Sequence, residues 1–148
     1  KTNVIAETMV VTGDMRTFSP EQLARTEVAM REIVSRHLPK TGAKIEFLDG
    51  YPPMAPSEGN RRLLGLYDRA SRDLGLGDVQ GVDPSRAGAA DVAFVAPIVP
   101  MIIDGIGLSG HDDHSDKETA DLRMLPAQTK RAAVLLFRLS ATLGSVRP

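Results

Sequence analysis

The sequence predicts an α/β chain in two parts, and three observations carry that prediction. Over residues 4–16, apolar and polar side chains alternate with period two, which is typical of a half-buried strand. Over residues 20–38, apolar side chains recur at helical spacing. Residues 51–58 are rich in proline, which favours an extended connector and marks a boundary between the parts.

The first part, residues 1–50, reads as a strand, a helix and a strand. Ser19 and Gln22 have the spacing of a helix capping box, and Pro20 stands at the first helical position. Two Glu–Arg pairs four residues apart support the polar face of this helix. Residues 44–47 alternate again and give the second strand. This part alone is too small to build a core of its own.

The second part, residues 59–148, mixes helices with at least one strand. The pattern over 63–74 predicts an amphipathic helix that ends at a glycine, and residues 126–144 predict a C-terminal helix. Residues 100–103 read as a buried strand. Residues 91–95 are apolar, but the run is too short for periodicity to choose between helix and strand.

Composition excludes several classes of function. Lys and Arg total 18 against 19 Asp and Glu, so no nucleic-acid partner and no anionic membrane surface are expected. The absence of cysteine removes disulfides and thiolate metal sites and leaves the redox compartment open. With no long apolar run and no visible secretion signal, we expect a soluble protein of the cytoplasm or periplasm.

Residues 111–116, with the sequence His-Asp-Asp-His-Ser-Asp, are the densest cluster of candidate metal ligands, and they follow the predicted buried strand. Imidazole and carboxylate suit zinc or a similar ion. A solvated acidic loop with two surface histidines is the alternative interpretation. The glycines of residues 105–110 have the spacing of a dinucleotide-binding fingerprint. In that fingerprint a helix begins directly after the glycines and its N-terminus binds the phosphates, whereas here three aspartates follow, so a nucleotide site is not expected.

Five short segments resemble, in the same order, the C-terminal end of the M20 family of zinc exopeptidases. They are most similar to its glutamate carboxypeptidase branch. The segments are Thr2–Ile5, Gly13–Arg16, Ala87–Asp91, Asp104–Gly110 and His114–Glu118. Each is weak alone, but their order over nearly the whole chain supports the resemblance.

The resemblance implies a role for particular residues. His114 corresponds to the last ligand of a site with two zinc ions, in which cobalt can replace zinc. Arg16 corresponds to a lid arginine that receives the carboxylate of the substrate, a task that suits a bidentate guanidinium. Asn3 corresponds to a lid asparagine that reaches the active site of the neighbouring subunit. Gly88 and Ala89 correspond to a turn that lies against the bound substrate.

The resemblance also implies a fold and partners. Residues 1–50 would be the second half of a β-α-β lid and dimerisation domain. Residues 59–148 would be the C-terminal part of a catalytic domain with a mixed sheet and flanking helices. The expected protein is a homodimeric carboxypeptidase that uses metal-activated water on a small peptide or N-acyl amino acid. The general-base glutamate and the other metal ligands would precede Lys1, so this chain alone holds no catalytic residue and is expected to be inactive.

The spacing of Asn3 and Arg16 gives an independent check. They are 13 positions apart, so an extended strand would separate them by about 40 Å at roughly 3.3 Å per residue. If both residues serve catalysis, they must serve two different active sites, as a two-fold dimer with shared lids would require.

Some features depart from the family pattern and leave alternatives open. Tyr51 stands where the nearest branch has an arginine, and Ala90 stands where the family often has a threonine. One alternative is a non-catalytic relative or a dimerisation module of the same fold. Another is a self-contained metal site formed by residues 111–116 alone, in which His111 would matter as much as His114.

Overall fold

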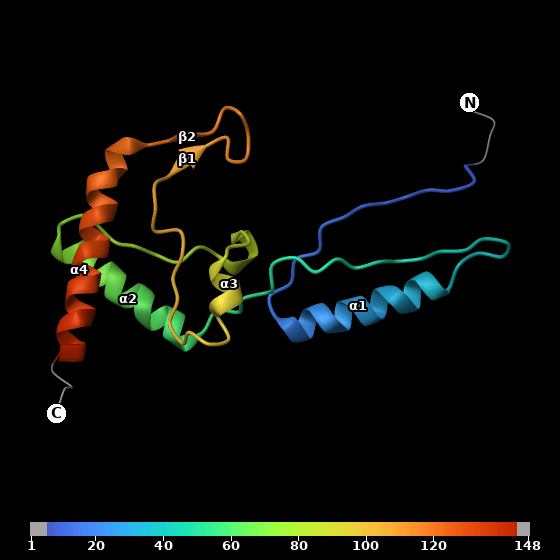
Figure 1. Cartoon of the computed structure of the whole chain (residues 1–148), viewed down its shortest axis with the longest axis horizontal. Helices are drawn as coiled ribbons and strands as arrows, with labels where there is room; N and C mark the ends of the chain where they lie inside the picture. Colours follow the sequence, from blue (N-terminus) through green and yellow to red (C-terminus); the bar gives the residue numbers. More distant parts are fainter. Residues whose placement is uncertain (1–5, 145–148) are drawn as a thin grey trace. The chain divides into compact units, whose positions relative to one another are not determined.

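The computed structural model describes residues 6–144, and side chains up to residue 141. The chain divides into an N-terminal unit, Lys1–Leu48, and a C-terminal unit, Asp49–Pro148, and each is described by itself (Figure 1).

Helix α1, Pro20–Ser35, is the main element of the N-terminal unit. Ser19 caps its start, where the Ser19 hydroxyl oxygen accepts a hydrogen bond of 3.2 Å from the backbone N–H of Gln22. The Gln22 side chain in turn accepts from the backbone N–H of Phe18 at 2.8 Å, one residue before the cap. The predicted cap at Ser19 is therefore confirmed, while the return bond of the capping box goes to Phe18 and not to Ser19. The helix ends at Ser35 because Arg36 leaves the helical region, with φ −98° and ψ 54°.

Both predicted Glu–Arg pairs form on the polar face of α1. The nitrogen-to-oxygen distance is 4.0 Å for Arg31 with Glu27 and 3.7 Å for Arg36 with Glu32. Such exposed pairs contribute only about 0.3–0.5 kcal/mol each. The Arg31 guanidinium also lies over the ring of Phe47, 4.8 Å from its centroid, so a cation–π contact holds residues near 47 against the helix.

Three segments differ from their predicted strand structure. Within the described residues, 6–16, 44–47 and 100–103 form no hydrogen-bonded ladder. A strand is stable only when a neighbour pairs with its backbone N–H and C=O groups, and alternation of side chains does not supply that neighbour. The α/β fold class, which needs a larger sheet, thus stays a prediction.

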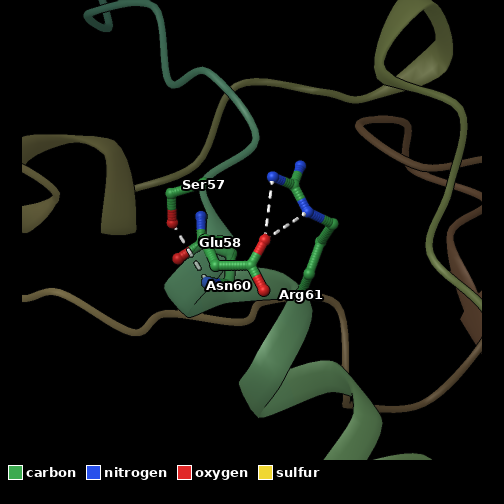
Figure 2. Close-up of polar contacts among 4 residues, drawn as sticks. All are labelled: Ser57, Glu58, Asn60 and Arg61. Atoms are coloured by element: carbon green, nitrogen blue, oxygen red, sulfur yellow. Dashed lines mark hydrogen bonds and ion pairs between the residues drawn. The ribbon is translucent and has the colours of Figure 1, made fainter.

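Helix α2, Glu58–Asp73, opens the C-terminal unit, and Figure 2 shows its first turn. The Ser57 hydroxyl oxygen accepts the backbone N–H of Asn60 at 3.0 Å and caps the helix. One carboxylate oxygen of Glu58 accepts from two nitrogens of Arg61, at 3.2 and 3.3 Å. At the other end Gly75 has φ +69°, a conformation that favours glycine, so the predicted glycine stop is confirmed.

The first turn of α2 also anchors the segment around residues 100–102. A Cβ at position 59 would overlap the carbonyl oxygen of Pro100, so only glycine allows this close approach. The Asn60 side-chain oxygen accepts the backbone N–H of Ile102 at 3.0 Å. Ile102 is buried, although its segment is not a strand.

Helix α4, Leu125–Gly144, packs against α2, and the two helices cross in Figure 1. Its position confirms the predicted C-terminal helix. An ion pair of 2.7 Å between Arg138 and Asp73 joins the two helices at the surface. The most buried residues of the unit come from α2, from α4 and from the segments between them: Tyr67, Ala70, Ser71, Ala93, Ile102 and Leu135.

Short elements complete the C-terminal unit. They are the 3-10 helices η1, Pro84–Arg86, and η2, Leu122–Met124, the one-turn helix α3, Val92–Val95, and the strands β1 and β2 described below. The apolar run at 91–95, undecided from sequence, therefore forms a helix. In the part of the chain that the structure describes, every helix is too short or too polar to cross a bilayer.

Candidate functional site

The predicted metal-ligand loop is the tip of a small hairpin between α3 and α4 (Figure 1). Strand β1, Gly110–His111, pairs in antiparallel register with β2, Thr119–Ala120. The backbone N–H of Asp121 donates to the carbonyl oxygen of Ser109 at 2.8 Å and extends the pairing by one bond. A Cβ at Gly110 would overlap the Thr119 carbonyl oxygen, so the last glycine of the 105–110 run is needed for the strands to meet.

The residues after the glycine run form this hairpin, and no helix N-terminus opens there among the described residues. The glycines therefore serve backbone turns and close strand contact. Gly105 has φ +70°, which other residues adopt only with strain.

Ser115 closes the tip of the hairpin. Its hydroxyl and its backbone N–H both donate to the carbonyl oxygen of Asp112, at 2.7 and 3.2 Å. The serine oxygen accepts the backbone N–H of Lys117 at 3.1 Å. These bonds are local, so the shape of the tip is set by its own residues.

His114 lies in the turn that forms the tip of the hairpin. Its φ is +66°, and that of Asp112 is +58°, so two non-glycine residues occupy the left-handed region. Histidine and aspartate tolerate this region better than most residues. The backbone N–H of His114 donates to a Glu118 carboxylate oxygen at 3.3 Å, which links the two arms of the tip.

Every side chain from His111 to Ala120 is exposed. At the base of the hairpin, hydrogen bonds from the side chain and the backbone of Arg123 lower the pKa of Asp121 below its usual value, and the charge of His111 adds a smaller effect. Within residues 6–141, no three His, Asp or Glu side chains converge on one point where they could hold a metal ion. The geometry gives no support to a self-contained metal site at 111–116.

Arg16 lies in the N-terminal unit, on the segment that precedes α1. Its Nε donates to a carboxylate oxygen of Asp14 at 2.7 Å, and the two side chains are 72% and 73% exposed. The bond engages one of the five N–H groups that a guanidinium carries. Arg16 is thus held at the surface by a residue of its own segment.

Gly88 and Ala89 lie in the exposed turn between η1 and α3, within the C-terminal unit. His114 belongs to the same unit, whereas Arg16 belongs to the other one. Asn3 lies outside the described residues.

Sequence reasoning missed a contact that holds the end of this turn. The Tyr51 hydroxyl donates to a carboxylate oxygen of Asp91 at 3.0 Å, and the Tyr51 ring packs 5.3 Å from that of Phe94. This hydrogen bond, followed by the negative charge of Asp91, raises the pKa of the Tyr51 phenol. Tyr51 had stood out only as a departure from the family pattern, and the 40 residues that separate it from Asp91 hide the pairing from any local signal.

In a comparison with known proteins, this chain is similar to a peptidase. The similarity supports the broad class of hydrolases for this chain. That relative is carboxypeptidase G2 from Pseudomonas sp. (strain RS-16), which is 27% identical over 144 residues. The match covers 94% of this chain but only 34% of the relative, so the chain spans about a third of the length of the curated protein it matches. No protein-family profile matches the chain, and no solved structure matches it significantly.

Proposed function

We propose that these residues form the C-terminal portion of a zinc-dependent carboxypeptidase of the M20 type. The complete protein would hydrolyse a peptide or amide bond next to a free carboxylate. The observation that carries the proposal is a match to a carboxypeptidase that runs along 94% of the chain. The order of the short segments from Thr2 to Glu118 supports it.

His114 is the proposed metal ligand of this chain. An exposed imidazole on a hairpin tip suits zinc and is open to further ligands from other residues. A catalytic zinc needs about three protein ligands, and within residues 6–141 no such group converges. The remaining ligands and the general-base glutamate are therefore assigned to residues of a longer polypeptide. When bound, the metal would polarise the scissile carbonyl and lower the pKa of a water molecule.

Arg16 is the proposed recognition site for the substrate carboxylate. A guanidinium can donate two parallel N–H bonds to a carboxylate, and this geometry distinguishes a free C-terminus from an amide. The 2.7 Å bond from Nε to Asp14 orients the side chain and leaves the two Nη groups at its outer end. Gly88 and Ala89 would lie against the substrate through their backbone, since neither carries a polar side chain.

Arg16→Ala tests this proposal in the longest natural protein that contains these residues. The KM for an N-acyl amino acid should rise roughly 10- to 100-fold, because a hydrogen bond to a charged group contributes about 1.5–3 kcal/mol. The preference for that substrate over its C-terminal amide should disappear. Steady-state kinetics on both substrates measure the two effects.

Arg36→Ala is the matched control, since Arg36 is an exposed arginine of the same unit that pairs with Glu32. It should keep the KM and the preference of the unchanged protein. If Arg16→Ala behaves like this control, the assignment of Arg16 is wrong. If the unchanged protein hydrolyses neither peptides nor N-acyl amino acids, the peptidase proposal itself fails.

A second candidate is a non-catalytic dimerisation module, and one observation favours a role in assembly. Among the side chains described, α1 buries none, and apolar residues of the N-terminal unit are strongly exposed. Val10 and Val11 are 89% and 84% exposed, and Leu48 is 93% exposed. A second copy that covers this surface would remove the apolar area from water at about 25 cal/mol per Å².

Sedimentation equilibrium of the 148-residue chain tests this assembly. We expect a dimer, and Val11→Lys should shift it to the monomer because a buried unpaired ammonium is costly. Ser35→Lys, which adds the same charge at an exposed polar position of α1, should remain dimeric. A chain that stays monomeric at every concentration tested would contradict a homodimer through this unit.

A further inference from the structure

A polar network lies where α2 and α4 pack together, below the hairpin. The Arg131 guanidinium donates three hydrogen bonds: to the Ser71 hydroxyl oxygen at 2.9 Å, to the Gln128 side-chain oxygen at 2.7 Å and to the Leu76 carbonyl oxygen at 2.8 Å. Ser71 is fully buried, and its hydroxyl donates to the Gly77 carbonyl oxygen at 2.6 Å. Among the described residues, no buried side-chain nitrogen or oxygen lacks a partner. The network is therefore fully satisfied.

Gln128 is the member of this network that reaches the hairpin. Its side-chain oxygen accepts from Arg131 and also from the Tyr67 hydroxyl, at 3.3 Å. Its amide nitrogen donates to the carbonyl oxygen of Gly107 at 2.7 Å. A flipped amide would set an NH₂ group against the donors of Arg131 and Tyr67, so the network permits one orientation, and in that orientation the amide donates to Gly107.

The carbonyl group of Gly107 holds the segment that leads into the hairpin, because it accepts the hydrogen bond from Gln128. The segment 104–109 has no helix or ladder of its own, and only Ile106 and Leu108 of its residues are half-buried. It is tied at Gly107 by Gln128 and, two residues later, at Ser109 by the N–H of Asp121. Strand β1 begins at the next residue. The second arm of the hairpin continues through η2 into α4, and the bond from Gln128 holds the first arm against the two helices.

We propose that Gln128 is a positioning residue that fixes the hairpin carrying His114 onto the α2–α4 pair. Its link to catalysis rests on the proposed function of His114 as a metal ligand. Gln128 acts through the Gly107 carbonyl and does not touch the metal or the substrate. The amide nitrogen of Gln128 bonds to the segment that leads into the hairpin, and its amide oxygen bonds to Arg131 and Tyr67 on the two helices. A change at the nitrogen should therefore alter the hairpin and leave the contacts between the helices in place.

Gln128→Glu separates these two tasks in the 148-residue chain. The carboxylate is nearly isosteric and still accepts from Arg131 and Tyr67, but the oxygen that replaces the amide nitrogen has no N–H to donate and repels the carbonyl oxygen of Gly107. We expect hydrogen exchange of the Asp121 amide and of the β1–β2 ladder amides to accelerate roughly tenfold. The midpoint of urea unfolding should not fall, because the acceptor side of the network is retained. A residue that only stabilised helix packing would move the midpoint and leave local exchange unchanged.

Thr129→Glu is the matched control, since it adds the same charge at the adjacent, exposed position of α4. It should leave hairpin exchange as it is in the unchanged chain. If Gln128→Glu fails to fold, Gln128→Met replaces it, and the hairpin amides should then exchange faster by more than the loss of global stability explains. Hairpin exchange that matches the control in the folded variant overturns the inference.

Kinetics of the longest natural protein separate this inference from the proposed function. With Gln128→Glu, a lower kcat with little change in KM, together with faster hairpin exchange, supports both. Faster exchange with unchanged kcat supports the anchoring of the hairpin and counts against His114 as a ligand. Unchanged exchange overturns the role of Gln128 whatever the kinetics show.

Discussion

Arg131→Met should lower the free energy of unfolding of the C-terminal unit by about 2–4 kcal/mol, since hydrogen bonds to a charged group contribute about 1.5–3 kcal/mol and the acceptors left behind stay partly buried. The substitution keeps an unbranched side chain of similar reach but removes all three donors, which serve Ser71, Gln128 and Leu76. Ser71 lies on α2, Gln128 lies on α4 and Leu76 lies in the turn after α2. Loss of the guanidinium therefore removes contacts that connect the two helices with each other and with this turn.

Tyrosine fluorescence during urea unfolding measures this effect on the correct unit. The chain has no tryptophan and two tyrosines, Tyr51 and Tyr67, and both belong to the C-terminal unit. Lys130→Met is the matched control, because Lys130 is the adjacent, exposed cation of α4. Its effect should stay within about 0.5 kcal/mol. An Arg131→Met chain as stable as this control would contradict the role given to the network.

The helices could be predicted because their signals are local. The cap at Ser19, the apolar spacing along α2 and α4 and the stop at Gly75 each depend on residues within a few positions of one another. The end of α1 was predicted three residues too far, near Pro39, because Arg36 leaves the helical conformation before the proline forces it. Helix ends depend on single backbone angles, which spacing does not reveal.

The strands and the core network could not be predicted in the same way. Alternation at 6–16 shows which side chains share a face, but a ladder needs a partner that the pattern does not name. Arg131 and Ser71 are 60 residues apart, and Gln128 and Gly107 are 21 apart. Contacts over such separations arise from helix packing, so an isolated arginine or glutamine in the sequence gives no sign of them.

The candidate site shows the same division. Residue types predicted metal-ligand chemistry for the 111–116 cluster, and that stays a prediction, whereas its hairpin, closed by Ser115 and Gly110, could not be predicted. The Tyr51–Asp91 bond also escaped the sequence. The roles assigned to Arg16, Gly88 and Ala89 rest on the resemblance. The structure adds that Arg16 pairs with Asp14 at the surface and that Gly88 and Ala89 lie in an exposed turn.

On the proposed function, His114→Ala should abolish most of the activity of the longest natural protein that contains this chain. Loss of partners that merely support a metal ligand costs about 10- to 100-fold in metal affinity or activity, so loss of a ligand should cost at least about 100-fold in kcat. One of the two expected zinc ions should also bind more weakly. His111→Ala is the matched control, since His111 is an exposed histidine three residues earlier on the same hairpin, and it should stay within a few-fold of the unchanged protein.

The most direct test of the whole account is therefore zinc content, measured after dialysis and paired with kcat, for these two variants of the longest natural protein that contains the chain. The account predicts that His114→Ala loses one of two tightly bound zinc ions together with activity, while His111→Ala keeps both ions and its activity. Equal losses in the two variants would favour a self-contained site at 111–116, and full zinc and activity in His114→Ala would contradict its role as a metal ligand.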